Sequence, residues 1–372
     1  MFNDISRGKN KPDQIITIKD FVKNSQYRQK RETNRRNAWK KFAILALIFF
    51  LAAILWYGLR TNAALEKIST KESTFWEKII RLLPIDKSFF LRLPVEKSIF
   101  EEPDTLDKRI NFLILGIRGE NDPNGGLLTD TNIILSVRPY DNKIALISIP
   151  RDLFVETPGT SGKRKLNEAY EIGRKKNHSQ ELDYVKSVVS GISGLPIHYA
   201  VLINFNGFRD LINSLGGIEL NLEKPFIEQV PFEEGAISLP AGRQVIYGQT
   251  ALLYTRARMS SSDFDRSRRQ EEVIKAVYAK LNKTGVLLNP YRLDKIFSVI
   301  ENNIKTDMRV WEIEETIKML ANTENPKIIT KVIDSGPEKL LYSGYTNDGV
   351  FILLPSAGDY KKIQEVIRNI FD

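Results

Sequence analysis

The sequence predicts an α/β protein in which a central mixed sheet carries helices on both faces (α-β-α), preceded by one transmembrane helix. Two observations lead to this fold class. From residue 110 onward, β-branched and apolar runs with the length of buried strands alternate with stretches of helical periodicity, an order typical of a sheet covered by helices. Near the N-terminus stands an uncharged apolar run of eighteen residues, close to the length of a membrane-spanning helix.

The positive charge of the chain is concentrated before that apolar run. Residues 1–41 hold 12 Lys and Arg against 4 Asp and Glu, whereas the remaining residues hold 43 against 42. The segment lacks apolar periodicity, so we expect a disordered cytoplasmic tail. Because nucleic-acid-binding proteins more often carry basic patches over their folded body, the asymmetry favours a tail at the membrane surface and no nucleic-acid partner.

Residues 42–59, FAILALIFFLAAILWYGL, are predicted to span the cell membrane once. Trp39 lies on one side and Trp56 with Tyr57 on the other, where interfacial aromatic residues belong, and the Lys and Arg residues upstream predict a cytoplasmic N-terminus and an extracytoplasmic body. A cleaved signal peptide is disfavoured by the long charged region before the apolar run and by the lack of a clear small-residue cleavage site. A buried core helix is disfavoured by the length and the flanks.

A lead-in segment and one folded body follow. Residues 60–109 mix helical periodicity with three prolines, so we expect a stalk packed loosely against the body. The body comprises a main domain, residues 110–285, and residues 286–372, which continue it without a linker. The predicted strands are 110–117, 131–138, 143–149, 199–205 and 327–333. The predicted helices are 166–175, 183–193, 206–217, 249–256, 267–281, 291–302, 310–322 and 357–371.

Polar residues at strand ends are the first candidates for a site. Asp130 stands at the entry to one predicted strand, and Arg151 with Asp152 follows the end of another. Ligands of open α/β sheets bind outside the carboxyl ends of the strands. A turn cap for Asp130 and a local pair between Arg151 and Asp152 are structural alternatives, and these residues alone leave the choice open.

The densest cluster of candidates is residues 254–270, YTRARMSSSDFDRSRRQ, with five arginines, no lysine and two aspartates. Guanidinium groups bind phosphate oxygens in bidentate fashion, so the cluster favours a polyphosphate site. Asp263 and Asp265 interrupt it where carboxylates could hold a hard cation. A solvated surface of ion pairs is the alternative, and Arg268 and Arg269, farther along the predicted helix, fall under it.

Several catalytic chemistries are excluded or disfavoured by composition. The chain has no cysteine, which excludes disulfides and thiol nucleophiles. It has only two histidines, and their spacing disfavours a His-based metal site or a Ser-His-Asp triad.

Seven segments, covering roughly residues 111–276, resemble in order the LytR-CpsA-Psr family of cell-envelope glycopolymer transferases. They are FLILGI, LTDTNIILSV, ISIPRDLFVETPG, KLNEAY, HYAVLINFNGFRDLINSLGGIELNL, GQTALLYTRAR and DFDRSRRQEEVI. The predicted topology, a short tail, one membrane helix and an outside catalytic domain, is similar to that of the family. The resemblance implies transfer of a glycopolymer, such as teichoic acid or capsular polysaccharide, from a polyisoprenyl pyrophosphate carrier to peptidoglycan in cell-wall assembly. It also implies that lipid phosphate leaves and that Mg²⁺ bridges the pyrophosphate.

The resemblance also implies roles for individual residues. Asp130 is similar to the family's metal-associated aspartate, and Asp263 to the acidic residue before the last phosphate-binding arginine, which makes these two the candidate metal ligands. Four arginines resemble the family's pyrophosphate-binding arginines, and these are Arg151, Arg256, Arg258 and Arg266. We expect catalysis to rest on Asp130, Arg151 and Arg266. Asp130, and after it Asp152, is the candidate general base for the acceptor hydroxyl.

The chain departs from the family at two positions. Many members carry an aspartate shortly after the first strand's glycine and an arginine just before the Thr-Asp pair, whereas this chain has Arg118 and Leu128 there. The polyisoprenyl tail needs an apolar slot, which residues 201–215 are expected to line, with ordinary core as the alternative. Two other functions stay open: a non-catalytic regulator or binder of polyanion or lipid pyrophosphate, and a lipid pyrophosphate hydrolase.

Overall fold

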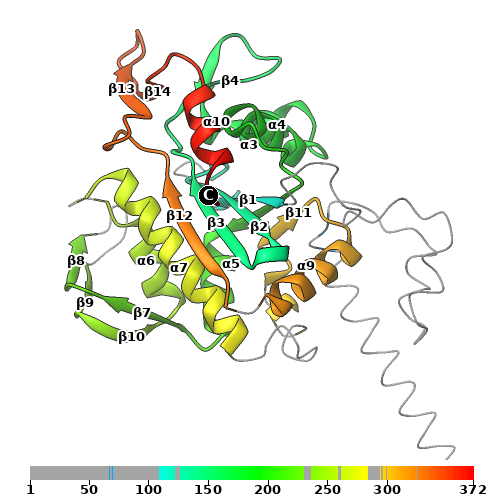
Figure 1. Cartoon of the computed structure of the whole chain (residues 1–372), viewed down its shortest axis with the longest axis vertical. Coiled ribbons are helices and arrows are strands. Elements are labelled where there is room, and N and C mark those ends of the chain that lie inside the picture. Colours follow the sequence, from blue (N-terminus) through cyan, green and yellow to red (C-terminus); the bar gives the residue numbers. More distant parts are fainter. Residues whose placement is uncertain are drawn as a thin grey trace, which may run out of the picture. The chain divides into compact units, whose positions relative to one another are not determined.

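Figure 1 shows the protein as a computed structural model. The structure describes residues 67, 69, 109–120, 122, 126–229, 236–258, 261–283, 294, 296–298, 300–323 and 325–372. The predicted tail (1–41) and the predicted membrane span (42–59) lie outside these residues, as does nearly all of the predicted lead-in (60–109). No helix within the described ranges is long and apolar enough to cross a membrane.

A mixed sheet of six strands, in the order β11-β6-β1-β2-β3-β12, forms the centre of the described body. Its strands are β1 (Ile110–Ile117), β2 (Thr131–Arg138), β3 (Lys143–Ser148), β6 (Tyr199–Asn204), β11 (Ile304–Thr306) and β12 (Lys327–Val332). β1 pairs in parallel with β6, and β3 with β12, while β2 lies antiparallel between β1 and β3 and β11 is antiparallel to β6. The predicted mixed α/β sheet is therefore confirmed.

Helices cover both faces of this sheet. On one face lie α3 (Ala169–Lys176), α4 (Glu181–Ser193) and α10 (Lys361–Arg368), and on the other α7 (Asp263–Lys283) and α9 (Val310–Asn322). Successive residues of β1 point to opposite faces, so Leu113 and Leu115 pack in the core under α3, α4 and α10. Ile110 and Phe112 pack in a separate core with Val310 of α9.

A smaller layer packs against α7. It contains α5 (Phe205–Ser214), α6 (Gly248–Arg256) and two hairpins, β7 (Ile218–Leu222) with β10 (Gly242–Ile246) and β8 (Phe226–Gln229) with β9 (Ala236–Leu239). Their apolar side chains share one core with Val273 of α7. No strand is predicted from the sequence for residues 218–246. These strands are short, and β7 alternates buried and exposed residues, so they lack the continuous apolar runs of the central strands.

Two further hairpins and two short helical turns complete the described chain. They are β4 (Phe154–Glu156) with β5 (Lys163–Lys165), β13 (Leu341–Tyr345) with β14 (Phe351–Pro355), η2 (Pro139–Asp141) and η3 (Leu166–Glu168). The helix predicted from residue 166 begins at Ala169, because the preceding three residues form the 3-10 turn η3, where the Glu168 carboxylate accepts from Lys165 N at 3.3 Å.

The strand directions bring several chain segments to one edge of the sheet. β1, β3 and β6 all end there, and β2, which runs the other way, begins there. A Cβ at Gly116 would lie 2.9 Å from the Thr131 side chain, so glycine allows this close pairing at the end of β1. Asp130 N donates to Gly116 O at 2.9 Å, which fixes the residue just before β2 beside β1.

Candidate active site

Three of the residues that follow or precede central strands meet at this edge. Asp130 precedes β2, Arg118 follows β1 and Arg151 lies three residues beyond β3. Arg151 donates a short hydrogen bond from Nη1 to Asp130 Oδ1, and Arg118 Nε lies 3.9 Å from Asp130 Oδ2. One carboxylate is therefore flanked by two guanidinium groups from different strands.

Helix α7 starts four residues earlier than predicted, and its N-terminal cap explains the difference. Asp265 N donates to Ser262 Oγ at 3.1 Å, and Ser262 N donates to Asp265 Oδ2 at 3.0 Å, so the two residues cap each other. The Ser262 hydroxyl, followed by Arg268, lowers the pKa of the Asp265 carboxyl. The candidate cation ligand Asp265 is thus committed to the helix start, and Asp263 faces the strand ends instead.

The arginines of α7 face three different directions. Arg266, with Gln270 and Ile274 at successive intervals of four, lies on the helix side that faces the strand ends. Arg268 is exposed and pairs with Asp265 at 2.7 Å, as the surface interpretation expected. That interpretation is wrong for Arg269, which is 8% exposed and donates to Tyr254 O at 3.0 Å. Arg269 holds the end of α6 against α7 and is not a surface charge.

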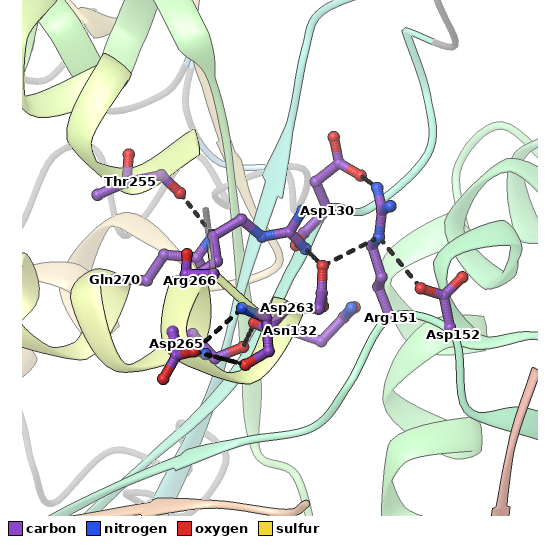
Figure 2. A network of polar contacts seen from close by, with 12 residues as sticks. Asp130, Asn132, Arg151, Asp152, Thr255, Asp263, Asp265, Arg266 and Gln270 are labelled. Atoms are coloured by element: carbon purple, nitrogen blue, oxygen red, sulfur yellow. Dashed lines mark hydrogen bonds and ion pairs between the residues drawn. The ribbon is translucent and has the colours of Figure 1, made fainter. Parts of the chain in front are cut away.

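Arg266 joins α7 to the strand ends. Its Nη2 donates to Asp130 O at 3.2 Å and lies 2.9 Å from Asp263 Oδ1, and Asp263 lies between Arg266 and Arg151 (Figure 2). Arg151 Nε is 3.8 Å from the same Asp263 oxygen and 3.5 Å from Asp152 Oδ2. The predicted strand-end residues and the predicted helix residues therefore form one network.

The two central arginines differ in electrostatic surroundings. Burial lowers the pKa of the Arg266 guanidinium, although Asp263 opposes this. Burial also acts to lower the pKa of Arg151, but the carboxylates of Asp130, Asp152 and Asp263 outweigh it and the pKa is raised. Arg266 thus has fewer compensating anions, so an anionic ligand beside it would relieve a desolvated charge.

A pocket with about 910 Å³ of space, partly open to solvent, lies over this network. One part of its wall is cationic, and these residues are Arg118, Arg151, Arg256, Arg258 and Arg266. Another part is apolar, and these residues are Ile114, Ile203, Phe205, Phe208, Leu252 and Ile274. The pocket wall therefore combines cationic and apolar side chains. Part of the predicted slot, residues 201–215, lies on that apolar wall.

Phe205 separates two of the arginines at the rim. The guanidinium carbon of Arg256 lies 4.6 Å from the Phe205 ring centroid, and that of Arg118 lies 5.8 Å from it. Both distances are within the range of cation–π attraction. The aromatic ring thus limits where the two cations can move.

The structure brings most predicted site residues together. Asp130, Arg151, Arg256, Arg258 and Arg266 all line the pocket, and Asp263 contacts two of these arginines. Asp152 is not in the pocket wall, and its carboxylate accepts from Lys165 Nζ at 2.7 Å. Gln270 also lines the pocket and is not among the predicted site residues, although its distance of four residues from Arg266 places it on the same helix side.

Asp130 and Asp263 are the carboxylates that fit a divalent cation. Asp263 Oδ1 is buried. It lies within ion-pair distance of Arg151 and Arg266 but accepts no hydrogen bond. In the described part of the chain, no group of three or more His, Cys, Asp or Glu residues is arranged to hold a metal ion. Mg²⁺ typically takes one or two protein carboxylates together with substrate phosphates and waters, so two carboxylates beside a phosphate site match that ion.

The chain is similar in sequence and in fold to known proteins of one family. The LytR_cpsA_psr family model matches residues 93–369. The chain is 27% identical over 277 residues, 73% of this chain and 67% of the other, to the polyisoprenyl-teichoic acid–peptidoglycan teichoic acid transferase TagV of Bacillus subtilis (strain 168). It is 28% identical over 279 residues, 74% of this chain and 84% of the other, to the transferase TagU of the same description from Enterococcus faecalis (strain ATCC 700802 / V583). The crystal structure of B. subtilis TagV shares the fold, with a TM-score of 0.55 at 24% identity over 72% of this chain and 99% of that one.

Proposed function

Because this chain belongs to the LytR_cpsA_psr family, we propose that it is a phosphotransferase that moves a glycopolymer from a polyisoprenyl pyrophosphate carrier to peptidoglycan in cell-wall assembly. The observation that carries the proposal is the pocket in which five arginines and Asp130 face an apolar wall. Relatives described as polyisoprenyl-teichoic acid–peptidoglycan teichoic acid transferases support it. Teichoic acid is accordingly the polymer class that we propose first.

The two kinds of side chain in the pocket wall match the two parts of such a carrier. A pyrophosphate presents several anionic oxygens, and guanidinium groups bind such oxygens with two parallel hydrogen bonds. The polyisoprenyl chain is apolar, so burying it against Ile114, Ile203 and Phe208 is favourable in proportion to the area covered. A free polyanion would use only the arginines, and the apolar wall therefore favours a lipid-linked ligand.

The reaction follows from where the charges lie. The acceptor hydroxyl oxygen bonds to the phosphorus that carries the glycopolymer, the bond from that phosphorus to the bridging oxygen breaks, and lipid monophosphate leaves. Asp130 takes the hydroxyl proton as general base. Arg151 and Arg266 neutralise the charge that develops on the phosphoryl oxygens, which is the main demand of phosphoryl transfer.

Asp130 and Asp263 would hold the Mg²⁺ ion that we propose as cofactor. When bound, the ion neutralises pyrophosphate charge and draws electron density from the leaving phosphate. The desolvated Asp263 oxygen fits this role, because it is buried and makes no hydrogen bond.

The test uses the full-length protein in detergent with a polyisoprenyl pyrophosphate-linked oligosaccharide, Mg²⁺ and peptidoglycan fragments. We expect release of lipid phosphate and a covalent glycan adduct on the fragments. Cleavage that gives no adduct would show a hydrolase. Absence of cleavage, with Arg151→Ala and Arg266→Ala weakening only binding, would show a binding protein. Arg268→Ala is the matched control, because that arginine is exposed and pairs outside the pocket.

We also propose that residues 42–59 anchor the protein in the cell membrane, with the N-terminus in the cytoplasm and the body outside. The uncharged run and the excess of Lys and Arg before it support this orientation. A protease added to intact spheroplasts should remove the body and leave residues 1–41 protected. Protection of the body would contradict the orientation.

A further inference from the structure

A second hollow adjoins the pocket. This groove has about 2530 Å³ of space open to solvent, and it shares Arg118, Asn204, Phe205, Leu252 and Arg256 with the pocket wall. The rest of its wall comes from the ends of β1 and β6 and the loop after β1, from α5 and the start of α6, from Tyr170 of α3 and the turn after that helix, from residues 301–305, and from Lys67 and Ser69. The groove therefore adjoins the pocket at Arg118 and Arg256.

The pocket and the groove lie on different faces of the central sheet. Ile114 of β1 and Ile203 of β6 line the pocket, whereas Ile117 and Leu202 line the groove. Residues an odd number of positions apart on a strand point to opposite faces. The two hollows adjoin each other at the strand ends and beside α5 and α6, where both are lined by Arg118, Asn204, Phe205, Leu252 and Arg256.

Several charged side chains along the groove form ion pairs with neighbours. Lys67 pairs with Glu301 at 2.5 Å, and Arg118 lies 3.8 Å from Asp122. Lys305 pairs with the buried Glu181, and Glu120 pairs with Arg174. Arg209 and Arg256 line the groove as well, so these ion pairs reduce the positive charge of the groove without removing it.

Uncharged hydrogen-bonding side chains make up much of the remaining wall. They are Tyr170, Ser179, Asn204, Asn206, Gln249, Asn302 and Asn303. Asn206 is exposed at the start of α5 and accepts from Arg209 Nη2 at 2.9 Å. Amides carry both donors and acceptors, which suits the hydroxyl and acetamido groups of a sugar chain.

We propose that this groove binds the acceptor glycan of peptidoglycan, an inference that rests on the proposed transferase function. In phosphoryl transfer the attacking and leaving oxygens lie roughly in line with the phosphorus. If the lipid lies in the pocket, its phosphate leaves toward the pocket, and the acceptor hydroxyl attacks from the opposite side. At the strand ends that side is the groove.

The test compares full-length wild type with Asn206→Ala, Gln249→Ala and the double variant. Transfer is measured first at varied peptidoglycan-fragment concentration with saturating donor, and then at varied donor concentration with saturating fragments. We expect the KM for the acceptor to rise about tenfold in the double variant, as lost hydrogen bonds predict, while the KM for the donor stays unchanged. Asn347→Ala, exposed at the turn between β13 and β14, is the control.

Direct binding separates this inference from the transferase proposal. Peptidoglycan fragments without donor should bind wild type and bind the double variant about tenfold more weakly, whether or not an adduct forms. A rise in the donor KM alone would assign the groove to the donor polymer and overturn the inference. Unchanged acceptor binding and acceptor KM would overturn it as well. Loss of adduct in wild type, with fragment binding intact, would count against the transferase proposal only.

Discussion

Arg266 of α7 donates a hydrogen bond to the backbone oxygen of Asp130, 3.2 Å away, although the two residues are 136 positions apart. Through it the helix that carries the arginine cluster is fixed to the edge where β1, β3 and β6 end. Arg266 is 5% exposed, so its guanidinium is held in place by this bond and by Asp263 before any ligand arrives. The proposed anion site is therefore largely preorganised at Arg266, which reduces the ordering cost of binding.

Replacing Arg266 by lysine should reduce kcat/KM for the lipid-linked donor by about 100-fold. A lysine keeps the charge but loses the planar fork that contacts Asp130 O, Asp263 and a phosphate together. Steady-state kinetics at saturating acceptor measure the effect. Arg268→Lys, on the exposed side of the same helix, should change kcat/KM less than twofold. Equal effects of the two substitutions would contradict the assignment of Arg266 to the site.

Asp263→Asn should raise the Mg²⁺ concentration needed for half-maximal transfer by about tenfold, because an amide oxygen is a weaker ligand for a hard cation than a carboxylate. A magnesium titration at fixed donor checks this. Asp265→Asn is the control: it weakens the cap with Ser262 and should lower the free energy of unfolding by about 0.5–1 kcal/mol without changing the magnesium dependence. An unchanged titration in Asp263→Asn would remove that residue from the metal site.

Phe205→Leu should weaken donor binding by about fivefold to thirtyfold. The ring lies 4.6 Å from Arg256 and 5.8 Å from Arg118, and each cation–π contact contributes about 0.5–1 kcal/mol. Leucine keeps the apolar wall, so the loss reports on arginine placement. Phe226→Leu removes the comparable contact of Arg269, at 5.1 Å, and should lower thermal stability while leaving donor affinity unchanged. Unchanged donor affinity in Phe205→Leu together with weaker donor affinity in Phe226→Leu would contradict the assignment of Arg256 to the pocket and of Arg269 to the packing between helices.

Glu271→Gln should stabilise the protein above neutral pH and leave stability unchanged below about pH 4.5. Glu271 is 3% exposed and accepts from Ser148 Oγ at 2.6 Å. Burial raises the pKa of its carboxyl from an ordinary 4.5 to about 7. The native state therefore binds the proton more tightly than the unfolded state, and wild-type stability falls as pH rises from about 4.5 to 7.

Urea denaturation at pH 5 and pH 8 measures this difference. Glutamine keeps the acceptor for Ser148 and cannot ionise, so we expect a gain of about 1–3 kcal/mol at pH 8. Glu365→Gln, an exposed residue of α10, should give the same stability as wild type at both pH values. A gain at pH 8 that is no larger than the gain at pH 5 would show that Glu271 is ionised in the native protein.

The central strands and most helices could be predicted from sequence because their signals are local. β1 and β2 coincide with the predicted ranges, since each is a largely apolar run of buried-strand length bounded by turn residues. The hairpins from β7 to β10 lack that signal, because their burial depends on α5, α6 and α7 packing over them. The capping pair Ser262 and Asp265 is local, yet the apolar periodicity of α7 begins after it, and the predicted start was too late.

The sequence by itself determined which residues could bind phosphate, because guanidinium chemistry and strand-end position follow from residue type and local pattern. Only the tertiary structure decided which of them share a site. It directed Arg266 to Asp130, kept Arg268 in solvent and buried Arg269 beneath α6. It also brought Arg118 next to Asp130 through the pairing of β1 with β2. The direction of a polar side chain depends on neighbours distant in sequence, which the folded chain alone brings together.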